Sequence, residues 1–254
     1  MRLPKTPSLR LDGRRALVTG AGRGIGLAAA AALAEAGAHV TLVARSAAEI
    51  EDAATAIRAA GGAADALTLD VLDVVAARNA IAAAEPFDVL VNNAGTNRPK
   101  PFTDVTLDDY DAVMDLNLRS AFFVAQAVAM RLVAAGQAGS IINISSQMGH
   151  VGGANRTIYC ASKWGMEGMT KAMAIDLATH RIRVNTVCPT FIETPLTRPF
   201  FQDAAFKANV LSRIKLGRIG QVEDLMGAIL FLAGDAAGLM TGSSIVVDGG
   251  WTAE

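Results

Sequence analysis

Short apolar segments rich in β-branched residues alternate with longer segments of helical periodicity along almost the whole chain. The first half pairs segments 16–18 with 27–36, 40–43 with 47–60, 67–69 with 74–84, and 89–91 with 107–135. The second half continues with 140–144, 158–178, 184–187, 221–233 and 244–247. Apolar runs without polar alternation are typical of strands buried on both faces, and helical crossovers between them require parallel pairing. The pattern predicts an α/β fold: a doubly wound parallel sheet of about seven strands with helices on both faces.

No linker rich in proline, glycine or serine divides the 254 residues, so we expect a single domain over residues 1–254. Residues 1–10 carry basic residues and two prolines but no apolar run, which indicates a loose N-terminal arm rather than a signal peptide. Residues 190–216 break the alternation after the sixth strand, and we interpret them as a substrate-loop insertion.

Composition excludes several classes of protein. Hydrophobic residues make up 52% of the chain, and 23 basic residues balance 24 acidic ones, which argues against disorder, nucleic-acid binding and attraction to an anionic membrane. Segment 28–38 contains Glu35 and falls short of the roughly 20 apolar residues that a spanning helix needs, so we expect no membrane segment. The two cysteines lack disulfide-framework or metal-ligand spacing, which favours a cytoplasmic protein without a metal.

A glycine-rich turn joins the first strand to the first helix. It contains Gly20, Gly22, Gly24 and Gly26, with Ile25 where strict G-x-G-x-x-G spacing would require the third glycine. Glycines let a backbone approach a pyrophosphate, and the N–H groups of the following helix receive its charge. This context favours a Rossmann-type dinucleotide site, although an ordinary strand-to-helix loop is an alternative for the turn alone.

Four further motifs follow in order along the chain. They are Asn92-Asn93-Ala94-Gly95, Asn117 in Asn-Leu-x-x-x-Phe, Ser146, and Tyr159-x-x-x-Lys163. Together with T-G-x-x-x-G-I-G, they make the sequence resemble the short-chain dehydrogenase/reductase family over essentially its whole length. The resemblance implies an NAD(P)(H)-dependent oxidoreductase that transfers a hydride between the nicotinamide and a secondary alcohol or ketone. A small sugar, polyol or 3-oxoacyl substrate is expected.

Tyr159 and Lys163 are four residues apart on a predicted helix, so their side chains lie on one face. A nearby ammonium favours the phenolate, which suits Tyr159 to general acid/base catalysis. The resemblance implies that Ser146 binds the substrate oxygen, with Ser145 as the rival, and that Asn117 joins a water-mediated proton relay with Lys163. A core tyrosine, a solvated lysine and a buried structural asparagine are the alternatives.

The second predicted strand leads into Ala44 and Arg45, and Ala44 is not the acid that NAD selectivity would need. Arg45 and Arg23 could instead bind the 2′-phosphate of NADP(H), which is therefore favoured over NAD(H). Either arginine could otherwise stack on adenine or face water. With the contacts implied by the resemblance, the expected cofactor-binding residues are Gly20, Arg23, Gly24, Ile25, Gly26, Arg45, Asp70, Val71, Asn93, Ala94, Gly95, Tyr159, Lys163, Pro189, Ile192 and Thr194.

The expected substrate pocket combines Ser146 with Met148, His150 and Arg156, which lie between Ser146 and Tyr159, and with Phe200 of a mobile lid in the insertion. The resemblance and the long apolar helices 107–135 and 158–178 also predict a homo-oligomer, specifically a tetramer. A catalytically silent nucleotide-sensing protein on the same fold is the alternative function.

Overall fold

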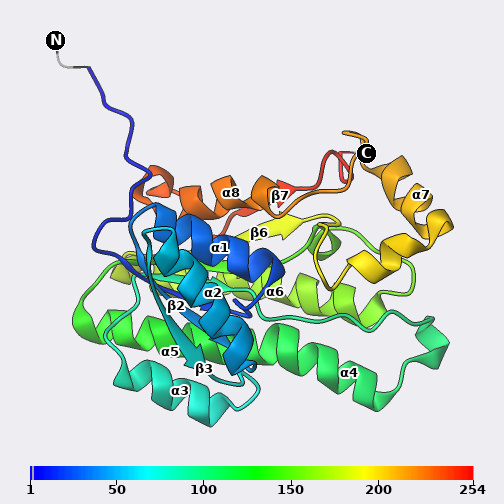
Figure 1. Cartoon of the computed structure of the whole chain (residues 1–254), viewed down its shortest axis with the longest axis horizontal. Helices are drawn as coiled ribbons and strands as arrows, with labels where there is room; N and C mark the ends of the chain where they lie inside the picture. Colours follow the sequence, from blue (N-terminus) through cyan, green and yellow to red (C-terminus); the bar gives the residue numbers. More distant parts are fainter. Residues whose placement is uncertain (2, 254) are drawn as a thin grey trace.

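One parallel sheet forms the centre of the computed structural model, which describes residue 1 and residues 3–253 (Figure 1). Its strands are β1 (Arg15–Thr19), β2 (His39–Ala44), β3 (Ala63–Thr68), β4 (Val89–Asn92), β5 (Gly139–Ile144), β6 (Ile182–Pro189) and β7 (Ser244–Val247). They lie in the order β3-β2-β1-β4-β5-β6-β7, and every neighbouring pair is parallel. The order changes direction between β1 and β4, which confirms the predicted doubly wound, Rossmann-type sheet.

Helices cover both faces of this sheet. They are α1 (Gly24–Glu35), α2 (Ala47–Ala59), α3 (Val74–Ala83), α4 (Leu107–Met114), α5 (Ser120–Ala135), α6 (Thr157–Leu177), α7 (Ala204–Arg213) and α8 (Glu223–Ala233). Apolar residues of α1, α2 and α8 form one core with the sheet, and those of α3, α5 and α6 form a second core. Burying both sheet faces in this way explains why the strands read as continuous apolar runs.

Local sequence signals account for several helix ends. The Ser46 side chain caps α2 by accepting a hydrogen bond from the Glu49 N–H at 3.3 Å, and Thr106 with Asp109 forms a complete capping box at α4. Gly37 follows α1 and has a φ of +102°, which residues with a Cβ rarely adopt, so a glycine suits this helix end.

Two elements differ from the sequence prediction. β3 spans Ala63–Thr68 rather than 67–69, so Asp70 lies in the following loop instead of closing the strand. The stretch predicted as one helix over 107–135 contains a π-helical turn at Asp115–Arg119 between α4 and α5. Leu107–Ala135 is long and apolar enough to cross a membrane by length and composition alone; its α5 part packs on α3, β4 and β5.

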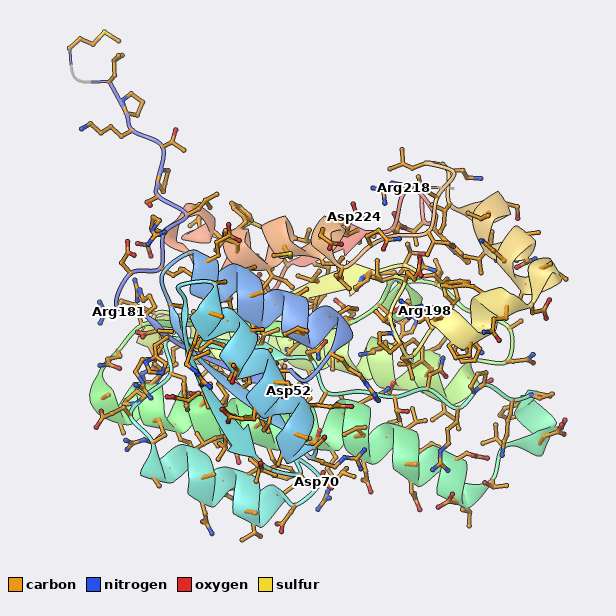
Figure 2. All side chains as sticks on the ribbon, in the orientation of Figure 1. Asp52, Asp70, Arg181, Arg198, Arg218 and Asp224 are labelled. Carbon is orange, nitrogen blue, oxygen red and sulfur yellow. The ribbon has the colours of Figure 1, made fainter. Side chains whose placement is uncertain are left out.

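The insertion after β6 is more structured than a simple loop. It holds a 3-10 helix at Arg198–Gln202 and then α7, and Ile192 pairs with Gly220 as an isolated parallel bridge. Arg218 donates to both carboxylate oxygens of Asp224, at 2.6 and 2.7 Å, and so joins the end of the insertion to α8 (Figure 2). At the other end of the chain, residues 3–10 are exposed and have no regular structure, and their trace extends away from the fold (Figure 1).

Candidate active site

A cleft of about 560 Å³ opens at the carboxyl ends of the central strands, where ligands bind in doubly wound sheets. The structure brings most of the predicted site residues to it. Those that line it are Gly20, Arg23, Gly24, Ile25, Arg45, Asp70, Val71, Asn93, Ala94, Gly95, Ser146, Met148, Arg156, Tyr159, Lys163, Pro189, Ile192, Thr194 and Phe200. Gly26, Asn117 and His150 do not line it.

Glycines shape the turn that enters α1. Gly20 and Gly24 have φ values of +63° and +58°, and a Cβ at Gly26 would overlap the carbonyl oxygen of Gly20 and lie 2.5 Å from Asn93 Nδ2. Gly26 therefore acts by allowing close packing rather than by lining the cleft. The Thr19 hydroxyl accepts hydrogen bonds from the Asn93 and Ala94 N–H groups at 3.0 and 3.1 Å, which fixes this loop against the turn.

The first turn of α1 has no side-chain cap. Its N-cap residue, Arg23, is extended and cannot cap the helix, because a guanidinium has no acceptor for the backbone N–H groups; it pairs instead with Glu49 at 3.2 Å. Helix N-termini that open on a cleft bind anions through free backbone N–H groups and the positive end of the helix dipole. A glycine cradle that a Cβ would fill, followed by an uncapped helix, thus fits the pyrophosphate of a dinucleotide.

The reactive end of the cleft contains Tyr159 and Lys163 on α6 and Ser146 after β5. Lys163 is buried, donates from Nζ to the Ile144 carbonyl at 2.7 Å, and lies 5.6 Å from the centroid of the Tyr159 ring. The Ser146 hydroxyl accepts from the Met148 N–H at 3.1 Å. The sequence spacing thus places a phenol, a serine hydroxyl and an ammonium around one position in the cleft.

Burial decides the protonation of this group. It raises the pKa of Tyr159, although a hydrogen bond with Ser146 opposes the increase, and it lowers the pKa of Lys163 to about 8. The expected effect of Lys163, which is to favour the phenolate, stays a prediction. Because burial is the larger effect, Tyr159 holds its proton at neutral pH and is ready to donate it.

Asn117 lies within the π-helical turn and is fully buried. Its Oδ1 accepts from the Thr96 N–H at 2.7 Å, and its Nδ2 donates to the Thr96 carbonyl at 2.9 Å and to Ser162 Oγ at 3.1 Å. Its side chain therefore holds the loop after β4 against α6. The proton relay that the family resemblance implies stays a prediction, and the side-chain amide already has these partners.

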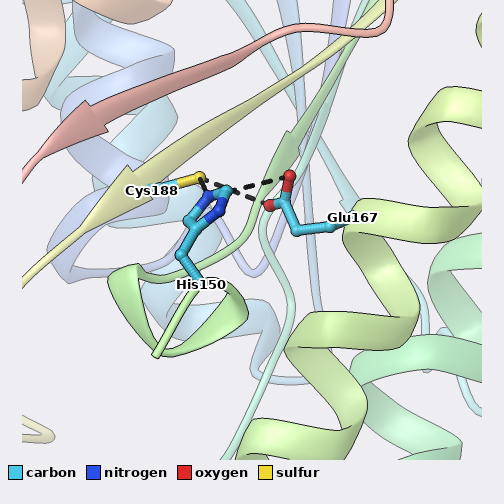
Figure 3. A group of neighbouring side chains, drawn as sticks. All are labelled: His150, Glu167 and Cys188. Carbon is cyan, nitrogen blue, oxygen red and sulfur yellow. Dashed lines mark hydrogen bonds and ion pairs between the residues drawn. The ribbon is translucent and has the colours of Figure 1, made fainter. Parts of the chain in front are cut away.

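His150 lies beside a buried network rather than in the substrate pocket, which corrects our expectation (Figure 3). Its Nε2 is 3.4 Å from Cys188 Sγ and 3.9 Å from a Glu167 carboxylate oxygen. The turn before it can approach α6 closely because Gly149 has no Cβ; one there would lie 3.1 Å from Glu167 Cγ.

Glu167 is the centre of this network. It accepts hydrogen bonds from Ser244 Oγ at 2.6 Å, Thr186 Oγ1 at 3.1 Å and Cys188 Sγ at 3.3 Å. Burial raises the pKa of Cys188 to about 12, which keeps the thiol protonated as a donor. His150, Glu167 and Cys188 bring three donor atoms within 4.8 Å of one another, but each already has a hydrogen-bonding or ionic partner, and the absence of a metal stays our prediction.

Two cleft residues have a feature that sequence reasoning missed. The amide of Gln147 is buried, with the residue 1% exposed, and neither its Oε1 nor its Nε2 has a partner within the described part of the chain. Thr190 Oγ1, also in the cleft wall, lacks a partner in the same way. In the sequence, Thr190 was notable only as the first residue of the predicted insertion. For Gln147, its position next to Ser146 was the one available signal.

Comparison with known proteins agrees with this geometry. Residues 20–252 match the family model described as enoyl-(acyl carrier protein) reductase. D-erythrulose reductase of Gallus gallus is 42% identical over 245 residues, which cover 96% of this chain and 98% of that protein. L-xylulose reductase of Bos taurus is also 42% identical over 245 residues, covering 96% and 99%.

Solved structures show the same fold. A gluconate 5-dehydrogenase from Burkholderia cenocepacia J2315, in complex with NADP and tartrate, superposes with a TM-score of 0.93 at 42% identity, covering 97% of this chain and 98% of that one. With the glycine cradle, the Tyr159–Lys163 pair and Ser146 in one cleft, these matches show that the chain belongs to the short-chain dehydrogenase/reductase family.

Proposed function

We propose that this protein is an NADP(H)-dependent oxidoreductase that interconverts a secondary hydroxyl and a ketone on a small sugar or polyol. The observation that carries the proposal is the meeting of Tyr159, Lys163 and Ser146 at one end of a cleft whose other end has a pyrophosphate cradle. The names of the relatives, D-erythrulose reductase, L-xylulose reductase and gluconate 5-dehydrogenase, support a sugar-type substrate.

The cleft offers a consistent set of cofactor contacts. The turn at Gly20 and Gly24 and the start of α1 would hold the pyrophosphate, and Asp70 with Val71 would lie at the adenine. Arg45 is exposed in the short loop between β2 and α2, and we assign it to the 2′-phosphate. The NADP in the gluconate 5-dehydrogenase structure supports this choice.

When bound, the nicotinamide supplies or accepts the hydride. Tyr159 then supplies the matching proton: in carbonyl reduction its hydroxyl donates to the substrate oxygen as that oxygen gains negative charge. Ser146 hydrogen-bonds the same oxygen and holds it beside the phenol. The Lys163 ammonium lies close to the ring, where it stabilises the phenolate that forms after the proton has left. A protonated Tyr159 in the free protein suits the reductive direction.

A silent nucleotide sensor would not need these three side chains around one position. The experiment compares the parent protein with Tyr159→Phe, following NADPH absorbance with a panel of ketoses, keto-acids and 3-oxoacyl thioesters. We expect turnover in the parent and a loss of at least a thousandfold in Tyr159→Phe, with NADPH binding retained because the ring still packs. Absence of turnover across the panel, or activity of Tyr159→Phe within tenfold of the parent, would contradict the proposal.

We also propose a homotetramer in the cytoplasm. Apolar side chains are exposed along α5 and α6, including Phe122 at 44%, Met130 at 55% and Trp164 at 54%, and association would cover them. Cys160 and Cys188 are both free thiols, which suits a reducing compartment. Analytical ultracentrifugation tests the assembly, and a stable monomer at micromolar concentration would refute it.

A further inference from the structure

Three observations around the substrate end of the cleft lack an explanation in the reaction itself. The first is the buried Gln147 amide without partners. Leaving such a group buried and unpaired destabilises a protein, so native structures seldom keep one without a use. Gln147 follows Ser146 directly in the chain and, like it, lines the cleft. An amide offers both donors and an acceptor, which is what a run of substrate hydroxyls requires.

The second observation is Arg156. Its side chain lines the cleft and is only 8% exposed, and no carboxylate among the described residues pairs with it. Its hydrogen bond is a long one, 3.4 Å to the carbonyl of the preceding residue, and its guanidinium lies 5.9 Å from the Phe200 ring centroid. A buried guanidinium stays charged, and it matches the geometry of a carboxylate.

The third observation is backbone strain next to that arginine. Asn155 has a φ of +58°, one of two positive-φ residues other than glycine in the described chain. Its carbonyl accepts a hydrogen bond from the Lys100 N–H at 3.2 Å, which fixes the conformation. Strained residues that the surroundings hold in place often serve to aim a functional group. Here the strain determines how Arg156 enters the start of α6, one turn before Tyr159.

From these observations we infer that the substrate is a sugar acid: a polyhydroxy chain that carries a carboxylate. Arg156 binds the carboxylate, and Gln147 binds hydroxyls next to the reacting carbon. The inference rests on the proposed oxidoreductase function and narrows it. It also names two specificity-determining residues, because a neutral sugar would leave Arg156 buried without a counter-charge, whereas an apolar acyl chain would leave the Gln147 amide unpaired.

The test uses a matched pair of substrates. 5-Keto-D-gluconate and L-sorbose differ only in a carboxylate at one end, and each is reduced with NADPH by the parent, Arg156→Gln, Arg156→Lys and Gln147→Met. We expect the parent to favour the acid in kcat/KM by at least tenfold. Arg156→Gln should lower the acid-to-neutral ratio by about ten- to a hundredfold, and Arg156→Lys should restore part of it. Gln147→Met should raise KM for both substrates and raise the thermal midpoint of the free protein.

Arg78→Gln, at an exposed position of α3 outside the cleft, is the matched control and should leave the ratio unchanged. An unchanged ratio in Arg156→Gln, or equal losses on both substrates, would overturn the assignment of Arg156. If the parent reduces only oxoacyl thioesters, the NADPH-dependent carbonyl reduction stands, but the sugar-type substrate and the sugar-acid inference both fail. If nothing turns over, titration calorimetry of D-gluconate and D-glucitol into NADP⁺-loaded protein still decides: equal binding, or none, overturns the inference.

Discussion

Replacing Arg45 with alanine tests how the cleft selects its cofactor. Arg45 lines the adenine end, is exposed, and has no acidic partner among the described residues. Hydrogen bonds to charged groups contribute about 1.5–3 kcal/mol, and we take the lower end because water and salt screen an exposed contact. About 1.5 kcal/mol corresponds to a roughly tenfold weaker affinity for NADPH. NADH lacks the 2′-phosphate, so its affinity should change little.

The assay is fluorescence titration of NADPH and NADH into the parent and the variant at one fixed ionic strength. Arg23→Ala should cost less than Arg45→Ala, because Arg23 is already held by Glu49 at 3.2 Å. Arg78→Ala serves as the control for loss of a distant arginine. Equal losses for both cofactors in Arg45→Ala, or a parent that prefers NADH, would refute the assignment of the 2′-phosphate to Arg45.

Two further predictions concern stability. Gly26→Ala should lower the unfolding free energy by about 1–3 kcal/mol, because the new Cβ overlaps the Gly20 carbonyl, whereas Gly168→Ala, which has open space, should not; thermal melts of both variants check this. Burial lowers the pKa of Lys163 to about 8, so between pH 8 and about 10.5 the unfolded chain binds more protons, and the unfolding free energy should rise with pH. Lys163→Met should flatten that rise in urea titrations, and an unchanged slope would contradict it.

The sequence predicted the sheet well because buried parallel strands leave continuous apolar runs. It placed β3 poorly for the opposite reason: β3 is an edge strand, only one of its residues is fully buried, and most of its residues are small or polar. The π-helical turn at Asp115–Arg119 was also missed, because one extra residue in a turn hardly disturbs apolar periodicity.

Within the candidate site, motif residues were predictable and environment-dependent ones were not. Glycine spacing and the Tyr159–Lys163 pair carry their geometry in the sequence. The sequence cannot show that the Gln147 amide lacks hydrogen-bond partners, because that depends on which groups the fold places around it. His150 shows the same limit: it lies between two cleft residues in sequence, but a tight turn directs it to Cys188 and Glu167. The protonation of Tyr159 likewise follows burial, which spacing cannot report.

The uncapped start of α1 leaves part of the stability of the fold to a bound dinucleotide. A helix that lacks a side-chain cap is less stable by about 1 kcal/mol, and the deficit here falls on the helix that packs against α8 in one of the two cores. A dinucleotide present at one hundred times its Kd would stabilise the fold by about 2.7 kcal/mol. Molecules without cofactor would then populate the unfolded state about a hundredfold more often, and would be the first that a protease reaches.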